Sequence, residues 1–208
     1  MSDEILKFFV LFFVVVEPIT LVPLFAALTE GADEEFRRRM ALKAVIVAGL
    51  VLLLFAVGGA WFLKVMGISV DAFRIAGGIM LFLIALEMVF ARESGTRTTP
   101  EEKDESRKRA DISVFPLAFP FIAGPGSIAI VLLTFGASRS DLVLSAGLFG
   151  AVLAVLAITY LLMRLTPLVM RVMGVTGGNV VNRLSGVVLA ALAVQFIITG
   201  VTNAFPQG

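Results

Sequence analysis

The stretch VVVEPITLVPLFAALTEG, residues 14–31, places a carboxylate and two prolines in the middle of a hydrophobic run. With ILKFFVLFF before it, the run covers residues 5–29, enough to cross the ~30 Å hydrocarbon core of a membrane as a helix. An ionised side chain at the centre of a span costs roughly 3 kcal/mol, and interior prolines remove helix hydrogen bonds. We therefore expect a broken helix here, with Glu17 at a site that offsets these costs.

The composition is typical of a membrane protein. Hydrophobic residues make up 59% of the 208 positions and charged residues 16%. No positively charged leader precedes the first apolar run, so we expect that run to be retained as a span. Cysteine and histidine are absent, which excludes disulfides, thiol and imidazole nucleophiles, and Cys/His metal sites. We expect no enzyme activity, no metal and no cofactor, and the net charge of +1 without a basic stripe argues against a nucleic-acid partner.

Six apolar runs are long enough to cross a membrane, and a polar segment separates the third from the fourth. The runs cover residues 5–29, 44–63, 73–91, 112–136, 142–163 and 184–205. The sequence therefore predicts an all-α integral membrane protein with six transmembrane helices. Its parts are a first three-helix repeat at 1–91, a cytoplasmic polar linker at 92–111 and a second three-helix repeat at 112–208.

The two halves share motifs in the same order. A Pro-x4-Pro spacing occurs at 18–23 and 120–125, and an Arg-x-x-Gly spacing occurs at 74–77 and 183–186. Because each half has three spans, a second copy must cross the membrane in the opposite sense. The pattern predicts an inverted repeat in which the first and fourth spans are both broken near mid-membrane.

Lysine and arginine are distributed unevenly between the two sides of this predicted topology. The loops after the first, third and fifth spans hold thirteen of the 17 such residues, and the other side holds four. The positive-inside rule then makes those three loops cytoplasmic and puts both termini outside a prokaryotic cell membrane. Arg74 and Arg183 fall on opposite membrane faces, as interfacial anchors or as gates.

The two predicted breaks can bind a small charged molecule. A helix that restarts inside the membrane presents free amides and the positive end of its dipole, which suits a carboxylate. A helix that stops there presents carbonyls, which suit an ammonium group. Both together suit a zwitterion at the repeat interface. The candidate binding residues are Glu17, Pro18, Thr20, Pro23, Gly124, Pro125, Gly126 and Ser127.

Each of these features also has a structural explanation. Prolines can simply kink a helix, and a protonated Glu17 can satisfy backbone donors that a proline frees. Thr20 and Ser127 can bond to their own helices. Glu87 fits either a packing role near the cytoplasmic end of its span or proton handling. Gln195 lies inside the sixth span, where it could line a cavity.

Small residues at four-residue spacing predict close helix packing. Ala146, Gly150 and Ala154 form such a series on the fifth span, and Gly186 with Ala190 forms another on the sixth. These faces are the sequence's only hint of a homo-oligomer.

Several quoted stretches closely resemble the MarC family, also called the neutral amino acid transporter family. They are VEPITLVPLFAALTEG, DAFRIAGGIMLFLIALEMVF, FPLAFPFIAGPGSIAIVLL and NRLSGVVLAALAVQFIITG. The resemblance implies a six-helix inverted-repeat transporter for small neutral amino acids such as glycine and alanine, driven by an ion gradient. In this motif position 17 more usually carries aspartate or asparagine, so Glu17 is a departure that bears on pocket size and coupling.

We therefore expect a secondary transporter that works by alternating access, coupled to protons or sodium. Its expected partners are a small neutral amino acid, the coupling ion and membrane lipid. The alternatives are a membrane-embedded enzyme acting on a lipid-linked substrate, an exporter of other small solutes, and a passive channel or structural partner.

Overall fold

Every element in the computed structural model is a helix, over the residues that the structure describes, 2–90, 111–138 and 141–205. In chain order these are α1 (Ser2–Val16), α2 (Leu21–Leu28), α3 (Glu34–Val65), α4 (Val70–Phe90), η1 (Ser113–Ile122), α6 (Pro125–Ala137), α7 (Leu142–Arg164) and α8 (Thr166–Ala204). The all-α prediction is confirmed over these ranges. All of the predicted linker except Asp111 lies outside the described residues.

Five helical stretches of the described chain are long and apolar enough to cross a membrane. They are Ser2–Leu28, Glu34–Val65, Val70–Phe90, Leu142–Arg164 and Val180–Ala204. The η1 and α6 helices add a sixth when they count as one span, bent by 57° at their junction. The protein is therefore a multi-pass membrane protein, with the predicted six spans if the bent pair crosses once.

The second span is longer than its apolar run. α3 begins at Glu34, ten residues before the predicted boundary, because the Asp33 carboxylate caps it by accepting a hydrogen bond from the Phe36 amide at 2.7 Å. Its 32 residues extend about 48 Å at 1.5 Å per residue, which is well beyond a ~30 Å hydrocarbon core. The first turns of α3 therefore carry the charged residues outside that core.

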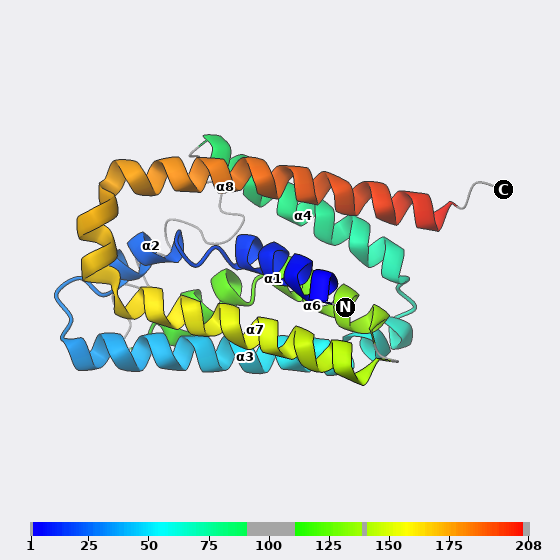
Figure 1. Ribbon diagram of the computed structural model, residues 1–208, viewed down its shortest axis with the longest axis horizontal. Helices are drawn as coiled ribbons and strands as arrows, with labels where there is room; N and C mark the ends of the chain where they lie inside the picture. The colour runs from blue at the N-terminus through cyan, green and yellow to red at the C-terminus, as the bar shows by residue number, and fades with distance from the viewer. Residues whose placement is uncertain (1, 91–110, 139–140, 206–208) are drawn as a thin grey trace.

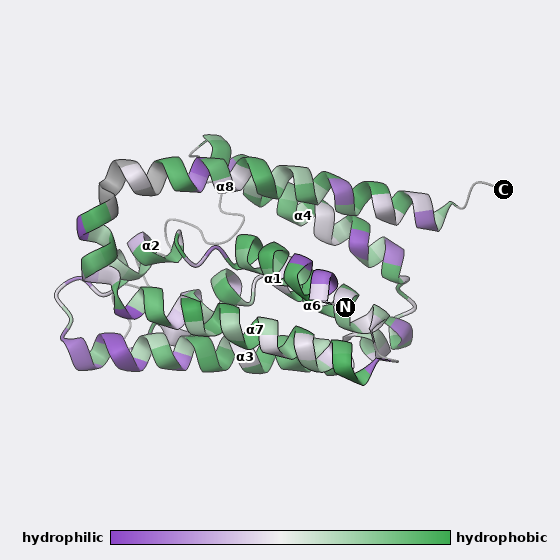
Figure 2. Ribbon diagram, in the orientation of Figure 1, coloured by the Kyte–Doolittle hydropathy of each residue, from purple (hydrophilic) through white to green (hydrophobic). Residues whose placement is uncertain are grey.

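The helices form two outer pairs with the interrupted segments between them. Figure 1 shows α4 and α8 side by side along one edge, α3 and α7 along the other, and α1, α2 and α6 in the middle. In Figure 2 the long helices are mostly hydrophobic, and hydrophilic residues gather toward the ends of α3 and α7, whereas α8 also carries some along its length. The connection between α1 and α2 is also hydrophilic in colour, although it lies between the two ends.

The α4–α8 pair is antiparallel and closely packed through glycines. A Cβ added to Gly78 on α4 would lie 2.8 Å from the Ala193 carbonyl oxygen of α8. A Cβ added to Gly186 on α8 would lie 3.1 Å from the Ala85 carbonyl oxygen of α4. The prediction of close packing is thus correct for Gly186. It is wrong within the chain for Gly150, where nothing lies within 4 Å of an added Cβ.

The α1–α6 and α3–α7 pairings are also antiparallel. The Phe8 ring of α1 meets the Phe135 ring near the end of α6 at 6.2 Å, while Val15, at the end of α1, lies against Gly126 at the start of α6. α3 and α7 run side by side in opposite directions in Figure 1. Each of the three pairings joins an element of one predicted repeat to its counterpart in the other. The inverted repeat stays a prediction, and this arrangement agrees with it.

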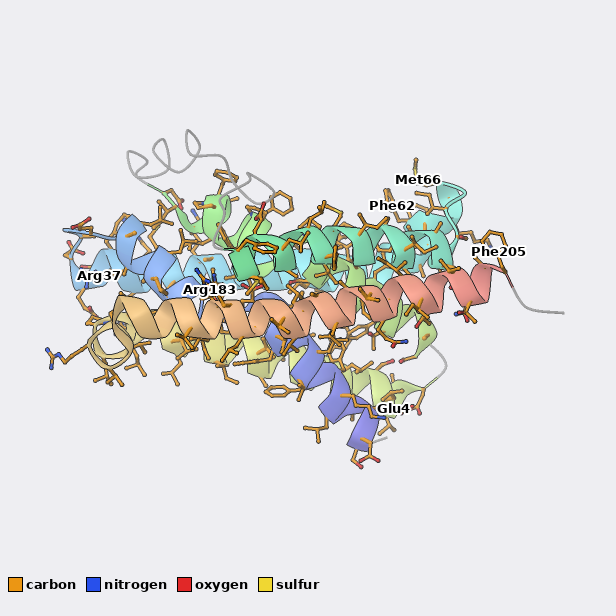
Figure 3. The ribbon with its side chains drawn as sticks, turned by 90° about the horizontal axis from the view of Figure 1, so that it is seen from above. Glu4, Arg37, Phe62, Met66, Arg183 and Phe205 are labelled. Atoms are coloured by element: carbon orange, nitrogen blue, oxygen red, sulfur yellow. The ribbon has the colours of Figure 1, made fainter. Side chains whose placement is uncertain are left out.

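Polar contacts gather at the two ends of the helices. Lys43 of α3 pairs with Asp111, which lies just before η1. This hydrogen bond, followed by those from Ser113, lowers the pKa of Asp111 from 3.8 to about 2. Figure 3 shows Glu4 and Phe205 toward one end and Arg37 at the opposite end. Both termini therefore lie toward the same end, as an even number of crossings requires.

Candidate functional site

The first span is interrupted between α1 and α2, as predicted. The last ladder bond of α1 runs from the Glu17 amide to the Phe13 carbonyl at 3.0 Å. Pro18 has no amide hydrogen, so it cannot donate to the Val14 carbonyl one turn earlier. The helix restarts at Leu21, whose amide donates to the Glu17 carbonyl at 3.2 Å. The Val14 carbonyl, near the end of α1, therefore has no helical amide to accept a hydrogen bond from.

Glu17 has a left-handed backbone with φ of 54°, and its side chain is buried, at 5% exposure. A residue that precedes proline is disfavoured in the right-handed helical region, so the chain turns here. The left-handed region costs a non-glycine residue roughly 1–2 kcal/mol. Aspartate and asparagine adopt it more readily than glutamate. Position 17 thus combines backbone strain with a buried acid.

Pro23 does not interrupt a helix, contrary to the prediction. It is the third residue of α2, in the first turn, where a missing amide hydrogen removes no helical bond. Thr20 occupies the N-cap position of α2 but makes no side-chain capping bond. Pro18 alone therefore interrupts the first span.

The fourth span is interrupted by wide turns and then a sharp bend. In η1 the hydrogen bonds reach back five residues, from Leu117 to Ile112 at 3.3 Å and from Ala123 to Ala118 at 2.8 Å. Phe115 and Phe119, each followed by a proline, have extended rather than helical angles. This span is therefore broken over most of η1, a longer interruption than the sequence indicates.

Gly124 and Pro125 form the junction at which α6 begins. Gly124 is extended, and a Cβ there would lie 2.2 Å from the Pro120 carbonyl oxygen, so only glycine fits. Pro125 is the first residue of α6, and the first bond into the helix runs from the Ile128 amide to the Gly124 carbonyl at 2.9 Å. The amides of Gly126 and Ser127 therefore precede the helical ladder and are free for other acceptors.

The two interruptions meet in the middle layer. A Cβ added to Gly126 would lie 3.2 Å from Cγ1 of Val15 and 2.2 Å from Cδ2 of Leu81. Between them is a cavity of about 10 Å³, lined by Val15, Leu81, Ile84, Pro120, Phe121, Gly124, Gly126 and Ser127. A volume of this size holds one water molecule at most. The junction is therefore closed in this conformation.

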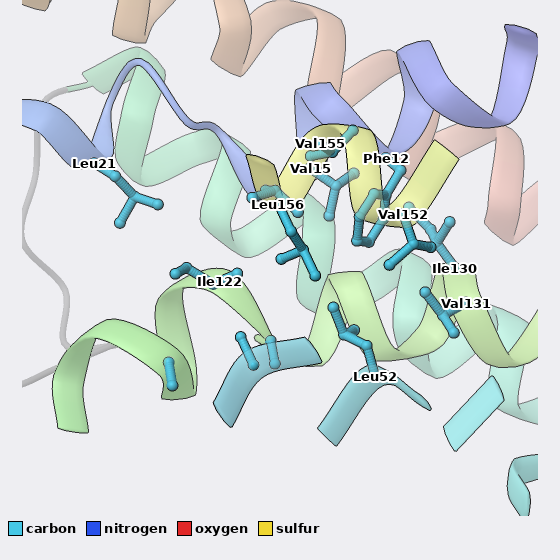
Figure 4. Close-up of a cluster of buried hydrophobic side chains, with 14 of the residues drawn as sticks. Phe12, Val15, Leu21, Leu52, Ile122, Ile130, Val131, Val152, Val155 and Leu156 are labelled. Atoms are coloured by element: carbon cyan, nitrogen blue, oxygen red, sulfur yellow. The ribbon is translucent and has the colours of Figure 1, made fainter. Parts of the chain in front are cut away.

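The buried side chains around this junction form one hydrophobic cluster. Figure 4 shows Leu21 from the start of α2 and Ile122 from the end of η1 in that cluster, together with Val15 and Phe12 of α1. Ser127 is a buried polar residue beside it, at 1% exposure. The polar groups at the two breaks are thus enclosed by apolar packing.

The structure brings together only some of the predicted binding residues. Of those, Gly124, Gly126 and Ser127 line the small cavity, and Glu17 lies two residues after the lining Val15. Pro18 is buried, while Thr20 and Pro23 are partly exposed. Leu81 and Ile84 of α4 also line the cavity. No sequence signal distinguished them from the other apolar residues of their span.

The remaining polar candidates lie away from the cavity lining. Glu87 is half-buried on α4, one turn beyond Ile84. Gln195 is exposed on α8 and donates to Thr199 of its own helix at 3.2 Å. Arg74 pairs with Asp71 at 3.0 Å.

Arg183 is exposed on α8. Because α4 and α8 are antiparallel, Arg74 and Arg183 lie at opposite ends of that pair. Over the described residues there is no group of three or more acidic side chains that could hold a metal ion.

Comparison with known proteins identifies the relatives of this chain. The family model described as "MarC family integral membrane protein" matches residues 2–205. The chain belongs to the MarC family. The Bacillus subtilis (strain 168) membrane protein YvbG is 38% identical over 99% of this chain and 98% of its own length. The Escherichia coli (strain K12) membrane protein YhcE is 34% identical over 96% of this chain and 93% of its own length.

The MarC family match covers both interrupted spans. A relative from Methanocaldococcus jannaschii is also 38% identical, over 96% of this chain. These relatives are named only as membrane proteins, so their names carry no substrate. No solved structure matches this chain.

Proposed function

We propose that the protein is a secondary transporter of small neutral amino acids that works by alternating access. The observation that carries this proposal is the meeting of two interrupted spans, where Val15 of α1 lies against Gly126 of α6. Irregular backbone inside a membrane persists where it is covered by protein or lines a water-filled cavity. A transport site gives both breaks such a role.

The backbone chemistry at the junction suits a zwitterion. The start of α6 offers the amides of Gly126 and Ser127 and the positive end of a helix dipole to a carboxylate. The end of α1 offers carbonyls that lack helical donors, together with the buried acid of Glu17, to an ammonium group. The walls between them are apolar, which suits a substrate whose side chain is small and uncharged.

The closed cavity requires motion. A space of about 10 Å³ cannot hold an amino acid, so the end of α1 and the start of α6 must separate when substrate enters. In an inverted repeat the two three-helix units can rock against each other around a fixed central site. The substrate then enters from the side of the membrane on which the junction opens.

Glu17 is the group to which we assign coupling. A buried acid can bind the substrate ammonium, carry a proton, or do each in turn, and a sodium ion could use the same carboxylate. The positive-inside rule orients the protein in the cell membrane with both termini outside. The cytoplasmic ends of the spans are then those near Arg37 and Arg164.

The experiment is uptake of labelled glycine or alanine into proteoliposomes under an imposed proton or sodium gradient. We expect accumulation above empty vesicles with one of the two gradients. We expect Glu17→Gln to abolish accumulation while the protein stays folded. Absence of uptake for every small amino acid tested would refute the proposal, and downhill flux that never concentrates substrate would instead identify a passive channel.

A further inference from the structure

An apolar groove runs along the outer surface between α3 and α7, away from the candidate transport site. Its volume is about 750 Å³, and its floor includes Val131 and Phe135 of α6. Of the described side chains that line it, Tyr160 alone carries a polar atom. Ile46 and Leu153 on its two walls are 52% and 65% exposed, so the groove is open at the outer surface of the protein.

The length of the groove fits a lipid tail. Its α3 wall extends from Leu42 to Ala56, which is about 21 Å at 1.5 Å per residue. One leaflet of a ~30 Å hydrocarbon core is about 15 Å thick. A groove of this length that begins at the membrane interface would therefore hold a whole acyl chain of one leaflet between apolar walls.

Arginines lie next to the groove at one of its two ends. Arg38 and Arg39 precede Leu42 by four and three residues, so they extend the same face of α3 toward its start. Both are exposed, and Arg39 lies over the Phe36 ring at 5.8 Å. At the far end of the groove the next basic residue on α3 is Lys64, two turns beyond Ala56.

Two other cations at this end already form ion pairs, and Arg37 donates to the Thr29 carbonyl at 3.5 Å. Lys43 contacts Asp111, and Arg164, one turn after Tyr160 on α7, contacts Glu34. No carboxylate within the described ranges forms an ion pair with Arg38 or Arg39. These two guanidinium groups therefore remain available for a ligand anion.

We propose that this groove binds an anionic phospholipid, with one acyl chain between α3 and α7 and the phosphate on Arg38 and Arg39. The apolar walls alone would accept the chain of any lipid. The arginine pair adds charge selection, because guanidinium groups bind phosphate oxygens through paired hydrogen bonds. Basic groups at the cytoplasmic membrane surface favour anionic lipids in the same way. This site is independent of the proposed transport function.

The test measures retained lipid on the purified full-length protein by native mass spectrometry. Dioleoyl phosphatidylglycerol and dioleoyl phosphatidylcholine are compared because they differ only in the headgroup. We expect one phosphatidylglycerol to be retained and to raise the thermal unfolding temperature more than phosphatidylcholine does. The double variant Arg38→Gln/Arg39→Gln should bind phosphatidylglycerol roughly ten- to thirtyfold more weakly than the wild type.

Two further variants keep the test decisive. Lys64→Gln removes a cation from the opposite end of α3 and should leave phosphatidylglycerol retention unchanged. Ala157→Phe fills the groove from an exposed lining position and should reduce retention of both lipids. Equal retention of the two lipids by all variants would overturn the proposal. So would a dimer that covers the groove and retains no lipid.

Discussion

Replacing Gly78 by alanine tests the close packing that joins the two halves of the molecule. Gly78 lies on α4, and its added Cβ would meet the Ala193 carbonyl oxygen at 2.8 Å and the Ile197 amide nitrogen at 3.2 Å. Both are backbone atoms of α8, so no side-chain rotation can relieve the contact. The two helices must therefore move apart.

The expected decrease in the free energy of unfolding follows from these distances. A carbon needs about 3.3–3.6 Å from a carbonyl oxygen, so the helices must separate locally by roughly 0.5–0.8 Å. Overpacking of this kind costs about 1–3 kcal/mol. The higher helix propensity of alanine returns up to about 1 kcal/mol. A net loss of about 1–2 kcal/mol corresponds to a fall of roughly 2–8 °C in unfolding temperature for a chain of this size.

The assay is thermal unfolding in detergent, followed by circular dichroism. The matched control is Gly58→Ala on α3, where nothing lies within 4 Å of the added Cβ. We expect the control to unfold at the wild-type temperature or slightly above it. If Gly78→Ala unfolds at the same temperature as Gly58→Ala, α4 and α8 are not in backbone contact at Gly78, which would refute the predicted loss.

Other substitutions test the site and the surface. Glu17→Asp retains the carboxyl group and better suits the left-handed backbone, so it should keep the coupled uptake that Glu17→Gln loses, as proteoliposome flux would record. Ser127→Ala removes a buried hydroxyl beside the amides that we assign to the substrate carboxylate, so it should weaken amino acid binding several-fold, as a thermal-shift titration with glycine would measure. Asp111→Asn removes a carboxylate whose pKa is lowered to about 2, mainly by Lys43. The stability from this partly exposed pair, at most about 1 kcal/mol, is present above pH 4 and disappears toward pH 2. The unfolding temperatures of wild type and variant should therefore converge over that range.

The sequence predicted the helical spans because their signal is strong and local. A long apolar run forms little else than a membrane helix. Pro18 predicts a break because proline has no amide hydrogen to donate. The boundaries were less accurate, since the capping carboxylate of Asp33 extends α3 well past its apolar run. The length of η1 was also missed. Its wide turns depend on extended angles at Phe115 and Phe119, which apolar periodicity does not encode.

The site was only partly predictable for a related reason. Gly124, Gly126 and Ser127 are recognisable in the sequence because small and polar residues beside prolines are uncommon in an apolar span. Leu81 and Ile84 line the same cavity but resemble every other residue of their helix. Their role depends on which face of α4 meets α6, and that is decided by tertiary packing. The same limit applies to Gly150, whose spacing indicated a helix contact that the chain does not make.

The two contacts between the halves differ in a way that bears on how a transporter of this design would open. At Gly78 an added Cβ meets backbone atoms of α8, whereas at Gly126 the three nearest atoms belong to the side chains of Leu81 and Val15. Under the proposed function we therefore expect the halves to pivot along α4 and α8 and to separate between α1 and α6. The chain has no native cysteine, so a disulfide can form only between the two cysteines that are introduced.

Both contacts accept the same design of cross-link. The added Cβ lies 3.2 Å from Cγ1 of Val15 at Gly126, and 2.8 Å from Cγ1 of Ile197 at Gly78. Oxidised Val15→Cys/Gly126→Cys should block uptake, and reduction should restore it, because the substrate cannot enter a junction that is held shut. Gly78→Cys/Ile197→Cys should transport equally well when it is oxidised and when it is reduced, because helices that act as a pivot do not separate during transport. If the first pair transports when it is oxidised, the substrate does not pass between the two interrupted spans.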